Sequence, residues 1–318
     1  MRVRQRRSTR HVRAGKNKRT CLLMQSKPMS APSSTLPPSP SDSSAPDDPR
    51  DFGLAATADP HRLYERAVQC AEAEVDFFER RFRLMRGRPA RRLREDFCGT
   101  AAVCCEWVGR HRQNRAVGVD IDPDVLDWGR GHNLSKLSPG AAKRVELRRD
   151  NVLDAGSDRY DIVAAMNFSY WLFKERAALR EYFGQVRASL ADDGVFFLDA
   201  YGGYDAFREI LEEREVDDAD GRFTYAWEQV GYNPISGEMT CHIHFAFPDG
   251  SRLQQAFSYH WRLWTLPEIR ELLAEAGFGR VVCYWQGWDA EGEADGIFEP
   301  ADRADADAGW ICYISAEP

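Results

Sequence analysis

One stretch of the chain, REDFCGTAAVCCEWV at residues 94–108, joins a strand-like run to a helix-like run through a single glycine, Gly99. A tight turn between a buried strand and a helix presents backbone N–H groups and a helix N-terminus to a ligand. The next apolar run, AVGVDID, includes Asp120 at its end, 21 residues after Gly99. An acid at that spacing binds the hydroxyl groups of a ribose. The two features predict a nucleoside-binding site whose loop is poor in glycine.

Polar residues at the ends of other strand-like runs extend this candidate site. Glu95 lies at the buried end of the first run, where its carboxylate needs hydrogen-bond donors from loop amides or from a ligand. Asp150 and Asn151 follow the third run, in RRDNVLD, although both are also common turn formers. Asn167 and Tyr170 follow the fourth run, in NFSYWLFK. Ligands of a doubly wound sheet bind outside the carboxyl ends of its strands, which is where all these residues are expected.

These positions require strands that alternate with helices. Apolar strand-like runs occupy 92–97, 115–120, 144–148, 160–166 and 194–199. Helical patterns occupy about 100–111, 122–133 and 174–190. Asp122 followed by Pro123 is a typical helix start. The alternation predicts an α/β fold, a Rossmann-like, doubly wound and mostly parallel sheet with helices on both faces.

After residue 200 the pattern becomes rich in β-branched and aromatic residues. RFTYAWEQVGYN, GEMTCHIHFAFPDG and RLQQAFSYHWRLW predict three strands of an inserted antiparallel sheet, which we expect to act as a lid. TLPEIRELLAEAGF predicts a helix between Thr265 as N-cap and Gly277 as stop. Two last strands are expected over 280–286 and 309–316. Ahead of the core, 60–85 has the periodicity of a helix.

The expected division of the chain is a disordered region at 1–50, a cofactor-binding core at 51–200, an inserted sheet at 201–264 and a C-terminal helix with a strand pair at 265–318. Residues 1–28 hold ten Lys and Arg and no acid. This run is either a nucleic-acid-binding or transit-like arm, or a segment ahead of a true start at Met29. The remaining residues carry 33 basic and 50 acidic side chains, so the folded body would repel a phosphate backbone.

Composition excludes further classes of protein. Hydrophobic residues make up 43 % of the chain, yet no run of about 18 apolar residues predicts a membrane span. The eight cysteines form no CxxC pair and no metal-ligand spacing, so we expect reduced thiols, no metal site and a cytoplasmic location. His242 and His244 alternate along one predicted strand and remain candidates for a general base.

Several motifs in the right order make the chain resemble the class I S-adenosylmethionine-dependent methyltransferases over roughly residues 60–317. The acid and three alternating glycines of the family's first loop fall on Glu95, Phe97, Gly99 and Ala101. The family's acid at the end of the second strand falls on Asp120, and its motifs around the third and fourth strands fall on 150–151 and 161–167. GVFFLDAYGG resembles the fifth strand, and LPEIRELLAEAGF with two further strands, one of them antiparallel at the end of the sheet, resembles the family's last helix and hairpin.

The resemblance implies S-adenosylmethionine as cofactor and transfer of its methyl group, by in-line displacement, to an N or O of a small molecule. The implied cofactor-binding residues are Tyr64, Glu95, Cys98, Gly99, Thr100, Asp120, Ile121, Asp150, Asn151 and Asn167. Tyr64 would close over the methionine end of the cofactor. Asn167 and Tyr170 are implied as catalytic residues on the acceptor side. The acceptor and the oligomeric state stay open.

Two of the three loop glycines of the family are absent here. S-adenosylmethionine has no phosphate that the backbone must approach, so side chains near it are tolerable if φ stays negative. We therefore expect Gly99 alone to need a special backbone conformation, with Phe97 and Ala101 only narrowing the site.

Three other functions compete with this interpretation. The missing glycines are compatible with a non-catalytic module that binds S-adenosylmethionine. Tyr170 and Lys174 have the Tyr-x-x-x-Lys spacing of NADP-dependent short-chain oxidoreductases, but the pair comes too early in the chain and the loop lacks the pyrophosphate glycines. A protein or RNA acceptor could use the basic arm, whereas the acidic body and the aromatic insert favour a small pocket.

Overall fold

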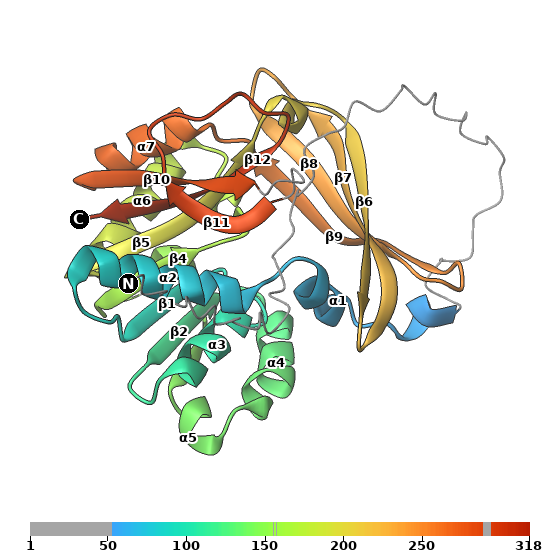
Figure 1. Ribbon diagram of the computed structural model, residues 1–318, viewed down its shortest axis with the longest axis horizontal. Helices are drawn as coiled ribbons and strands as arrows, with labels where there is room; N and C mark the ends of the chain where they lie inside the picture. Colours follow the sequence, from blue (N-terminus) through green and yellow to red (C-terminus); the bar gives the residue numbers. More distant parts are fainter. Residues whose placement is uncertain (1–52, 155, 157, 289–293) are drawn as a thin grey trace, which may run out of the picture.

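The computed structural model describes residues 53–318 apart from 155, 157 and 289–293, and it contains two β-sheets (Figure 1). The disorder expected for residues 1–50 falls outside the described residues. The first sheet has eight strands in the order β11-β10-β12-β5-β4-β1-β2-β3, and the second has four in the order β6-β7-β8-β9.

The elements have the following bounds. The first sheet is made of β1 (Arg92–Asp96), β2 (Arg115–Asp120), β3 (Val145–Arg149), β4 (Tyr160–Ala165), β5 (Leu190–Gly202), β10 (Arg280–Trp288), β11 (Ala294–Pro300) and β12 (Trp310–Glu317). The second is made of β6 (Ile210–Asp218), β7 (Gly221–Tyr232), β8 (Glu238–Ala246) and β9 (Arg252–Arg262). The helices are α1 (Pro60–Ala67), α2 (Ala71–Arg86), α3 (Ala102–Arg110), α4 (Pro123–His132), α5 (Pro139–Ala142), α6 (Arg176–Ser189) and α7 (Leu266–Glu275). Short 3-10 turns are η1 (Gly53–Thr57), η2 (Leu134–Lys136), η3 (Val152–Asp154), η4 (Ser169–Leu172) and η5 (Tyr204–Phe207).

Parallel pairing of the first five strands confirms the predicted fold class. β1 pairs in parallel with β2 and β4, β2 with β3, and β4 with β5. β12 lies antiparallel between β5 and β10. Helices cover both faces of the sheet, because Phe78 of α2 stacks on Phe197 whereas Phe183 of α6 packs on Phe196. Neighbouring residues of a strand point to opposite faces.

Two strands of the structure were not predicted from the sequence. β6 has the sequence ILEEREVDD, and β11 has the sequence ADGIFEP. Both are edge strands, where charged residues, glycine and proline replace the apolar alternation of a central strand. The inserted sheet therefore has four strands rather than three.

The periodic segment at 60–85 forms two helices rather than one. α1 ends at Ala67, and α2 starts after Cys70. α1 turns away to pack on the second sheet, where Arg66 forms an ion pair with Asp218 at 2.7 Å. α2 packs on the first sheet instead. The apolar stripe is continuous in sequence, but its two halves meet different sheets.

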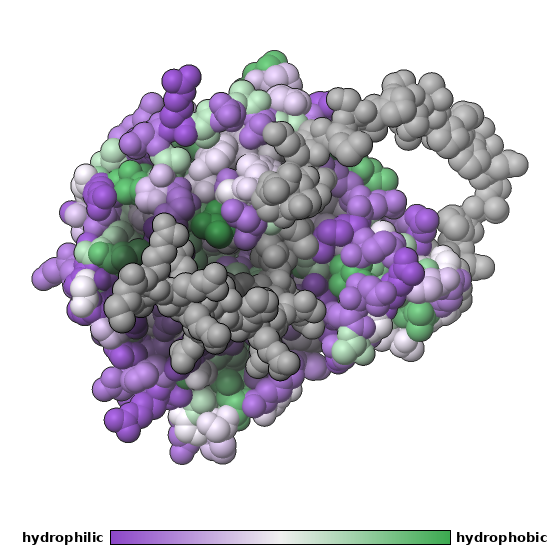
Figure 2. Space-filling view, in the orientation of Figure 1, coloured by the Kyte–Doolittle hydropathy of each residue, from purple (hydrophilic) through white to green (hydrophobic). Residues whose placement is uncertain are grey.

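Helix ends follow the predicted signals closely. Asp122 caps α4 by accepting a hydrogen bond from Asp124 N, and Pro123 is its first residue. Thr265 and Glu268 form a reciprocal capping box at the start of α7, and Gly277 follows its end with a φ of +95°. No helix among the described residues is long and apolar enough to cross a membrane. Hydrophilic residues dominate much of the described surface on the face shown in Figure 2.

The second sheet stands beside the first and next to α1 (Figure 1). One of its faces is aromatic and packs against the first sheet and the loop after β4. The ring centroids of Trp261 and Trp171 of η4 lie 6.0 Å apart, and those of Trp227 and Tyr201 of β5 lie 6.3 Å apart. The strand alternation sends His242 and His244 to the opposite face. The second sheet thus presents its aromatic face to the loop that follows β4.

Candidate active site

The loop between β1 and α3 has an alternating backbone conformation. φ is +56° at Phe97, +51° at Gly99 and +58° at Ala101. The expectation of negative φ at Phe97 and Ala101 is therefore wrong. The left-handed conformation costs about 1–2 kcal/mol at a residue that carries a Cβ. Phe97 and Ala101, at positions where the family has glycine, therefore adopt the positive φ that glycine favours.

Close packing restricts the glycines around the loop rather than Gly99 itself. A Cβ on Gly99 would find only Val125 Cγ2, at 4.0 Å. A Cβ on Gly118 of β2 would lie 2.8 Å from Cys98 Sγ, and one on Gly129 of α4 would lie 2.5 Å from the Thr100 carbonyl oxygen. Gly99 is needed for its positive φ, whereas Gly118 and Gly129 are needed for space.

Asp120 holds the loop from the end of β2. Its Oδ2 accepts a hydrogen bond from Gly99 N at 2.8 Å, and its Oδ1 accepts one from Asp122 N at 3.0 Å. Each carboxylate oxygen retains a lone pair for a further donor. The next residue, Ile121, is 69 % exposed although it is apolar. A charged acceptor and an uncovered apolar side chain therefore lie together at the carboxyl edge of the sheet.

Asp150 and Asn151 lie beside Asp120, as expected. Asp150 N donates to the Asp120 carbonyl oxygen at 3.1 Å, since β2 and β3 are paired. Both side chains are exposed, and each accepts a local backbone hydrogen bond, Asp150 from Asn151 N and Asn151 from Leu153 N. The structure thus groups the predicted ribose and adenine residues at one edge.

The two acids that end β1 point to opposite faces. Arg94 forms a buried bidentate ion pair with Asp96, with distances of 2.7 and 2.8 Å, and Tyr182 also donates to Asp96. Glu95 faces α3, where its Oε2 accepts from Cys104 N at 3.1 Å. Burial raises the pKa of Glu95 to about 8. Asp96 is therefore compensated within the fold, and the carboxylate that accepts from a backbone amide is Glu95.

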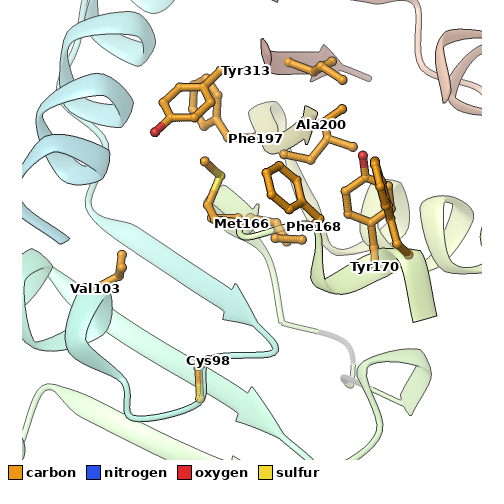
Figure 3. Close-up of a cluster of buried hydrophobic side chains, with 14 of the residues drawn as sticks. Cys98, Val103, Met166, Phe168, Tyr170, Phe197, Ala200 and Tyr313 are labelled. Carbon is orange, nitrogen blue, oxygen red and sulfur yellow. The ribbon is translucent and has the colours of Figure 1, made fainter. Parts of the chain in front are cut away.

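Three predicted cofactor residues use their side chains within the protein. Cys98 is buried against Gly118, and Figure 3 shows its sulfur inside the fold. Thr100 is also buried and donates to Glu65 of α1 at 2.5 Å. Tyr64 is half-buried and packs on Phe257 of β9 with ring centroids 5.1 Å apart. The Cys98 and Thr100 side chains therefore support the loop from behind, and the part of these two residues in cofactor binding stays a prediction.

The loop after β4 has a second strained turn. φ is +58° at Asn167 and +57° at Phe168. Asp199 of β5 accepts hydrogen bonds from both backbone amides, at 2.8 and 2.9 Å. Burial raises the pKa of Asp199 to about 7 despite these bonds. Asp199 thereby fixes Asn167, a predicted site residue, at the carboxyl end of β4.

The structure places Tyr170, predicted as a catalytic residue, in the core and not at an open edge of the sheet. Its ring is fully buried in the apolar cluster drawn in Figure 3, and its hydroxyl donates to the Asp199 carbonyl oxygen at 2.7 Å. Lys174 instead pairs with Glu238 at 2.8 Å. The Tyr-x-x-x-Lys spacing therefore places no reactive pair at the site.

The two histidines of β8 lie on the face of the second sheet that is turned away from the first. His242 Nδ1 is 2.8 Å from Ser258 Oγ, and His244 Nε2 is 2.9 Å from Glu228 Oε2. This position does not suit a general base at the carboxyl edge of the first sheet. Within the described ranges, no group of three or more His, Cys, Asp or Glu side chains is arranged to hold a metal ion.

A cavity of about 290 Å³ lies between α2, the ends of β4 and β5, and the β10–β12 strands. Asn167, Phe168 and Asp199 form part of its lining. Glu74 of α2 lines it too, although it is a buried acid. Its wall also includes aromatic side chains, among them Phe77.

Sequence reasoning missed three acids near the site: Glu65, Glu74 and Asp199. Glu74 and Asp199 have a signal that could have found them. Glu74 shares a helix face with Phe78, and Asp199 is the single acid in the apolar run VFFLDAY. Buried carboxylates are rare without a partner or a function. The contact of Glu65 with Thr100 has no comparable sequence signal, because it depends on how α1 is placed.

Comparison with known proteins gives structural neighbours only. No protein-family model matches the chain, and no curated protein matches it by sequence. A S-adenosylmethionine-bound amino pentose methyltransferase from Micromonospora echinaspora superposes with a TM-score of 0.59 at 17 % identity, over 81 % of this chain and 96 % of that chain. A S-adenosylmethionine-dependent methyltransferase from Clostridium acetobutylicum gives 0.57 at 15 %, over 81 % and 98 %. A sugar N-methyltransferase from a Streptoalloteichus species gives 0.55 at 16 %, over 87 % and 98 %.

The strand order, the antiparallel β12 and these superpositions define the class: the chain has the fold of the class I S-adenosylmethionine-dependent methyltransferases. Two of these neighbours are named for methylating an amino pentose and a sugar nitrogen.

Proposed function

We propose that the protein is a S-adenosylmethionine-dependent methyltransferase that acts on a nitrogen or oxygen of a small molecule. The observation that carries the proposal is the grouping of Asp120, Ile121 and the strained Gly99 turn at the carboxyl edge of β1 and β2. A carboxylate with free lone pairs suits ribose hydroxyls, and an exposed apolar side chain beside it suits an adenine face.

The residues present fit this cofactor. Asp120 would bind the ribose, Ile121 would pack on the adenine, and Asp150 with Asn151 would bind the edge of that ring. Glu95 would face the amino group of the methionine end. When bound, the cofactor would supply an electrophilic methyl group on a sulfonium: a lone pair of the acceptor would form a bond to the methyl carbon in line with the C–S bond, whose electrons would stay on sulfur as it breaks.

The acceptor would approach from the side of β4 and β5. Asn167 follows β4 in a backbone conformation held by Asp199, which accepts from the Asn167 backbone amide. The aromatic face of the second sheet lies against the same loop and would act as the lid. The neighbours that methylate an amino pentose and a sugar nitrogen support a small acceptor of this kind.

Calorimetry on the full chain with S-adenosylhomocysteine tests the proposal, with NADPH as the rival ligand. We expect a 1:1 complex with S-adenosylhomocysteine and no heat with NADPH. Binding of NADPH alone would support the oxidoreductase interpretation, and binding of neither would overturn the proposal. S-adenosylhomocysteine binding without transfer to any amine or alcohol tested would favour a non-catalytic binding module.

A further inference from the structure

The cavity beside Asn167 contains buried polar atoms with no partner. Glu74 is 2 % exposed, and no described residue donates a hydrogen bond to its Oε2. Gln286 Oε1 of β10, in the same lining, is also buried and unpartnered among the described residues. An unmatched buried acceptor costs about 1–3 kcal/mol, so such atoms mark a place where a ligand brings hydrogen-bond donors.

The charged groups around Glu74 also indicate a ligand site. Burial raises the pKa of Glu74 well above its usual range, and the charges of the Glu95 and Asp199 carboxyls raise it further. Neither Glu74 nor Asp199 forms an ion pair with a described Lys or Arg. Buried carboxyls without a counter-cation keep their protons, and a ligand that carries positive charge would stabilise their ionised form.

The carboxyls of Asp199 and Glu74 differ in whether an oxygen is still free to accept a hydrogen bond from a ligand. Asp199 already accepts from the backbone amides of Asn167 and Phe168, so its role is to position that loop. The Glu74 carboxyl accepts from the Cys70 backbone, and its Oε2 is buried behind the cavity lining without a partner among the described residues. Glu74 is therefore the acid that can hold a donor of the ligand.

At the Arg81 end of α2, the cavity lining contains a hydrogen-bond donor. Arg81 pairs with Glu299 at 2.9 Å, but its Nε is buried without a partner among the described residues. Glu74 and Arg81 are seven residues apart on α2, which corresponds to about 10 Å along the helix axis. Phe77 lies between them on the same helix and lines the cavity. The lining thus suits a small molecule with a donor at one end, an oxygen acceptor at the other and an apolar or ring-shaped middle.

We propose that this cavity is the acceptor site of the methyltransferase and takes a small amine that also carries an oxygen function, with Glu74 Oε2 binding the amino group. The proposal rests on the proposed function for its reaction. The amine would bind as an ammonium ion while Glu74 releases its own proton to solvent, and the N–H bond would then break as a proton moves from nitrogen to the Glu74 carboxylate. The electron pair left on nitrogen would form the new bond to the methyl carbon, and the C–S electrons would remain with sulfur.

The test compares two ligands that differ at a single group, trans-2-aminocyclohexanol and trans-1,2-cyclohexanediol. Their affinities for the full chain are measured by saturation-transfer NMR titration, with and without saturating S-adenosylhomocysteine. Glu74→Gln keeps the shape of the side chain but can neither ionise nor take up a proton. Glu72→Gln, on the exposed side of the same helix, is the matched control. Glu74→Met removes the polar atoms altogether and serves if Glu74→Gln fails to fold.

We expect the wild type and Glu72→Gln to bind the amino alcohol about tenfold more tightly than the diol, as one charged hydrogen bond implies. Glu74→Gln and Glu74→Met should lose this preference and change diol affinity by less than about twofold. No preference in the wild type, or a preference that survives both substitutions, would overturn the inference.

The affinity for S-adenosylhomocysteine separates this inference from the proposed function. It should stay within about twofold in all variants, because Glu74 serves the acceptor and not the donor. A parallel loss of S-adenosylhomocysteine affinity in Glu74→Gln would reassign the cavity to the cofactor. Absence of S-adenosylhomocysteine binding in the wild type would overturn the proposed function, while the amine preference measured without it would still decide the role of Glu74.

Discussion

Gly99 donates its backbone N–H to Asp120 Oδ2 at 2.8 Å, so the acid at the end of β2 holds the loop that follows β1. Asp120 ends β2 and Gly99 lies in the loop after β1, and these neighbouring parallel strands have their carboxyl ends at one edge of the sheet. The same carboxylate is the proposed ribose ligand. The loop and the ligand site are therefore built around a single side chain.

Asp120→Ala should weaken S-adenosylhomocysteine binding by about 10- to 100-fold, since it removes a charge-assisted contact of about 1.5–3 kcal/mol. It should also lower the free energy of unfolding by about 1 kcal/mol, because Gly99 N loses its acceptor. Calorimetry and urea denaturation measure the two effects. Asp122→Ala is the control: it removes a helix cap and about 1 kcal/mol of stability without changing affinity. Unchanged affinity in folded Asp120→Ala would contradict the ribose assignment.

Gly99→Ala should lower the free energy of unfolding by about 1–2 kcal/mol, through its positive φ and not through a clash. Gly99→Asn should cost less, because asparagine tolerates the left-handed region. Denaturation of both variants checks the order. A larger loss in Gly99→Asn would mean that space, and not φ, limits this position.

Gly129→Ala should destabilise the protein by about 1–3 kcal/mol, because the added Cβ would lie 2.5 Å from the Thr100 carbonyl oxygen. Gly131→Ala, two residues further along the same helix, meets nothing within 4 Å and should stabilise by up to about 1 kcal/mol. Opposite signs in thermal or urea denaturation are the expected result. Equal effects at the two positions would show that α4 does not pack on the loop in this way.

Glu95→Gln should make stability less dependent on pH. The pKa of Glu95 is raised from 4.5 to about 8, so between these values the folded protein retains a proton that the unfolded chain has lost. The free energy of unfolding therefore falls as pH rises through this window, and glutamine abolishes that contribution while its carbonyl can still accept from Cys104 N. Urea denaturation at pH 5, 6.5 and 8 tests this. Glu72→Gln, at an exposed position, should keep the wild-type slope, and an unchanged slope in Glu95→Gln would contradict the burial of an ionisable group there.

Local patterns in the sequence were sufficient for most of the first sheet and for its helix ends. β1 and β2 were predicted within one residue, because apolar runs and turn residues act over short distances. Asp122 and Thr265 were recognised as caps because a capping side chain bonds to amides two or three residues away. The order of acid, glycine and second acid was enough to place Asp120 beside the loop, since parallel strands share an edge.

Tertiary structure decided what those patterns do not encode. Cys98, Thr100 and Tyr170 look accessible in the sequence but point into the fold, because orientation at a strand end depends on what packs against it. Phe97 and Ala101 adopt positive φ since the hydrogen bonds around the turn outweigh a local cost. The cavity joins Glu74, Asp199 and Gln286 from three distant segments. The sequence by itself determined the sheet and the edge at which a ligand is proposed to bind, whereas burial and long-range packing decided which side chains remain free at that edge.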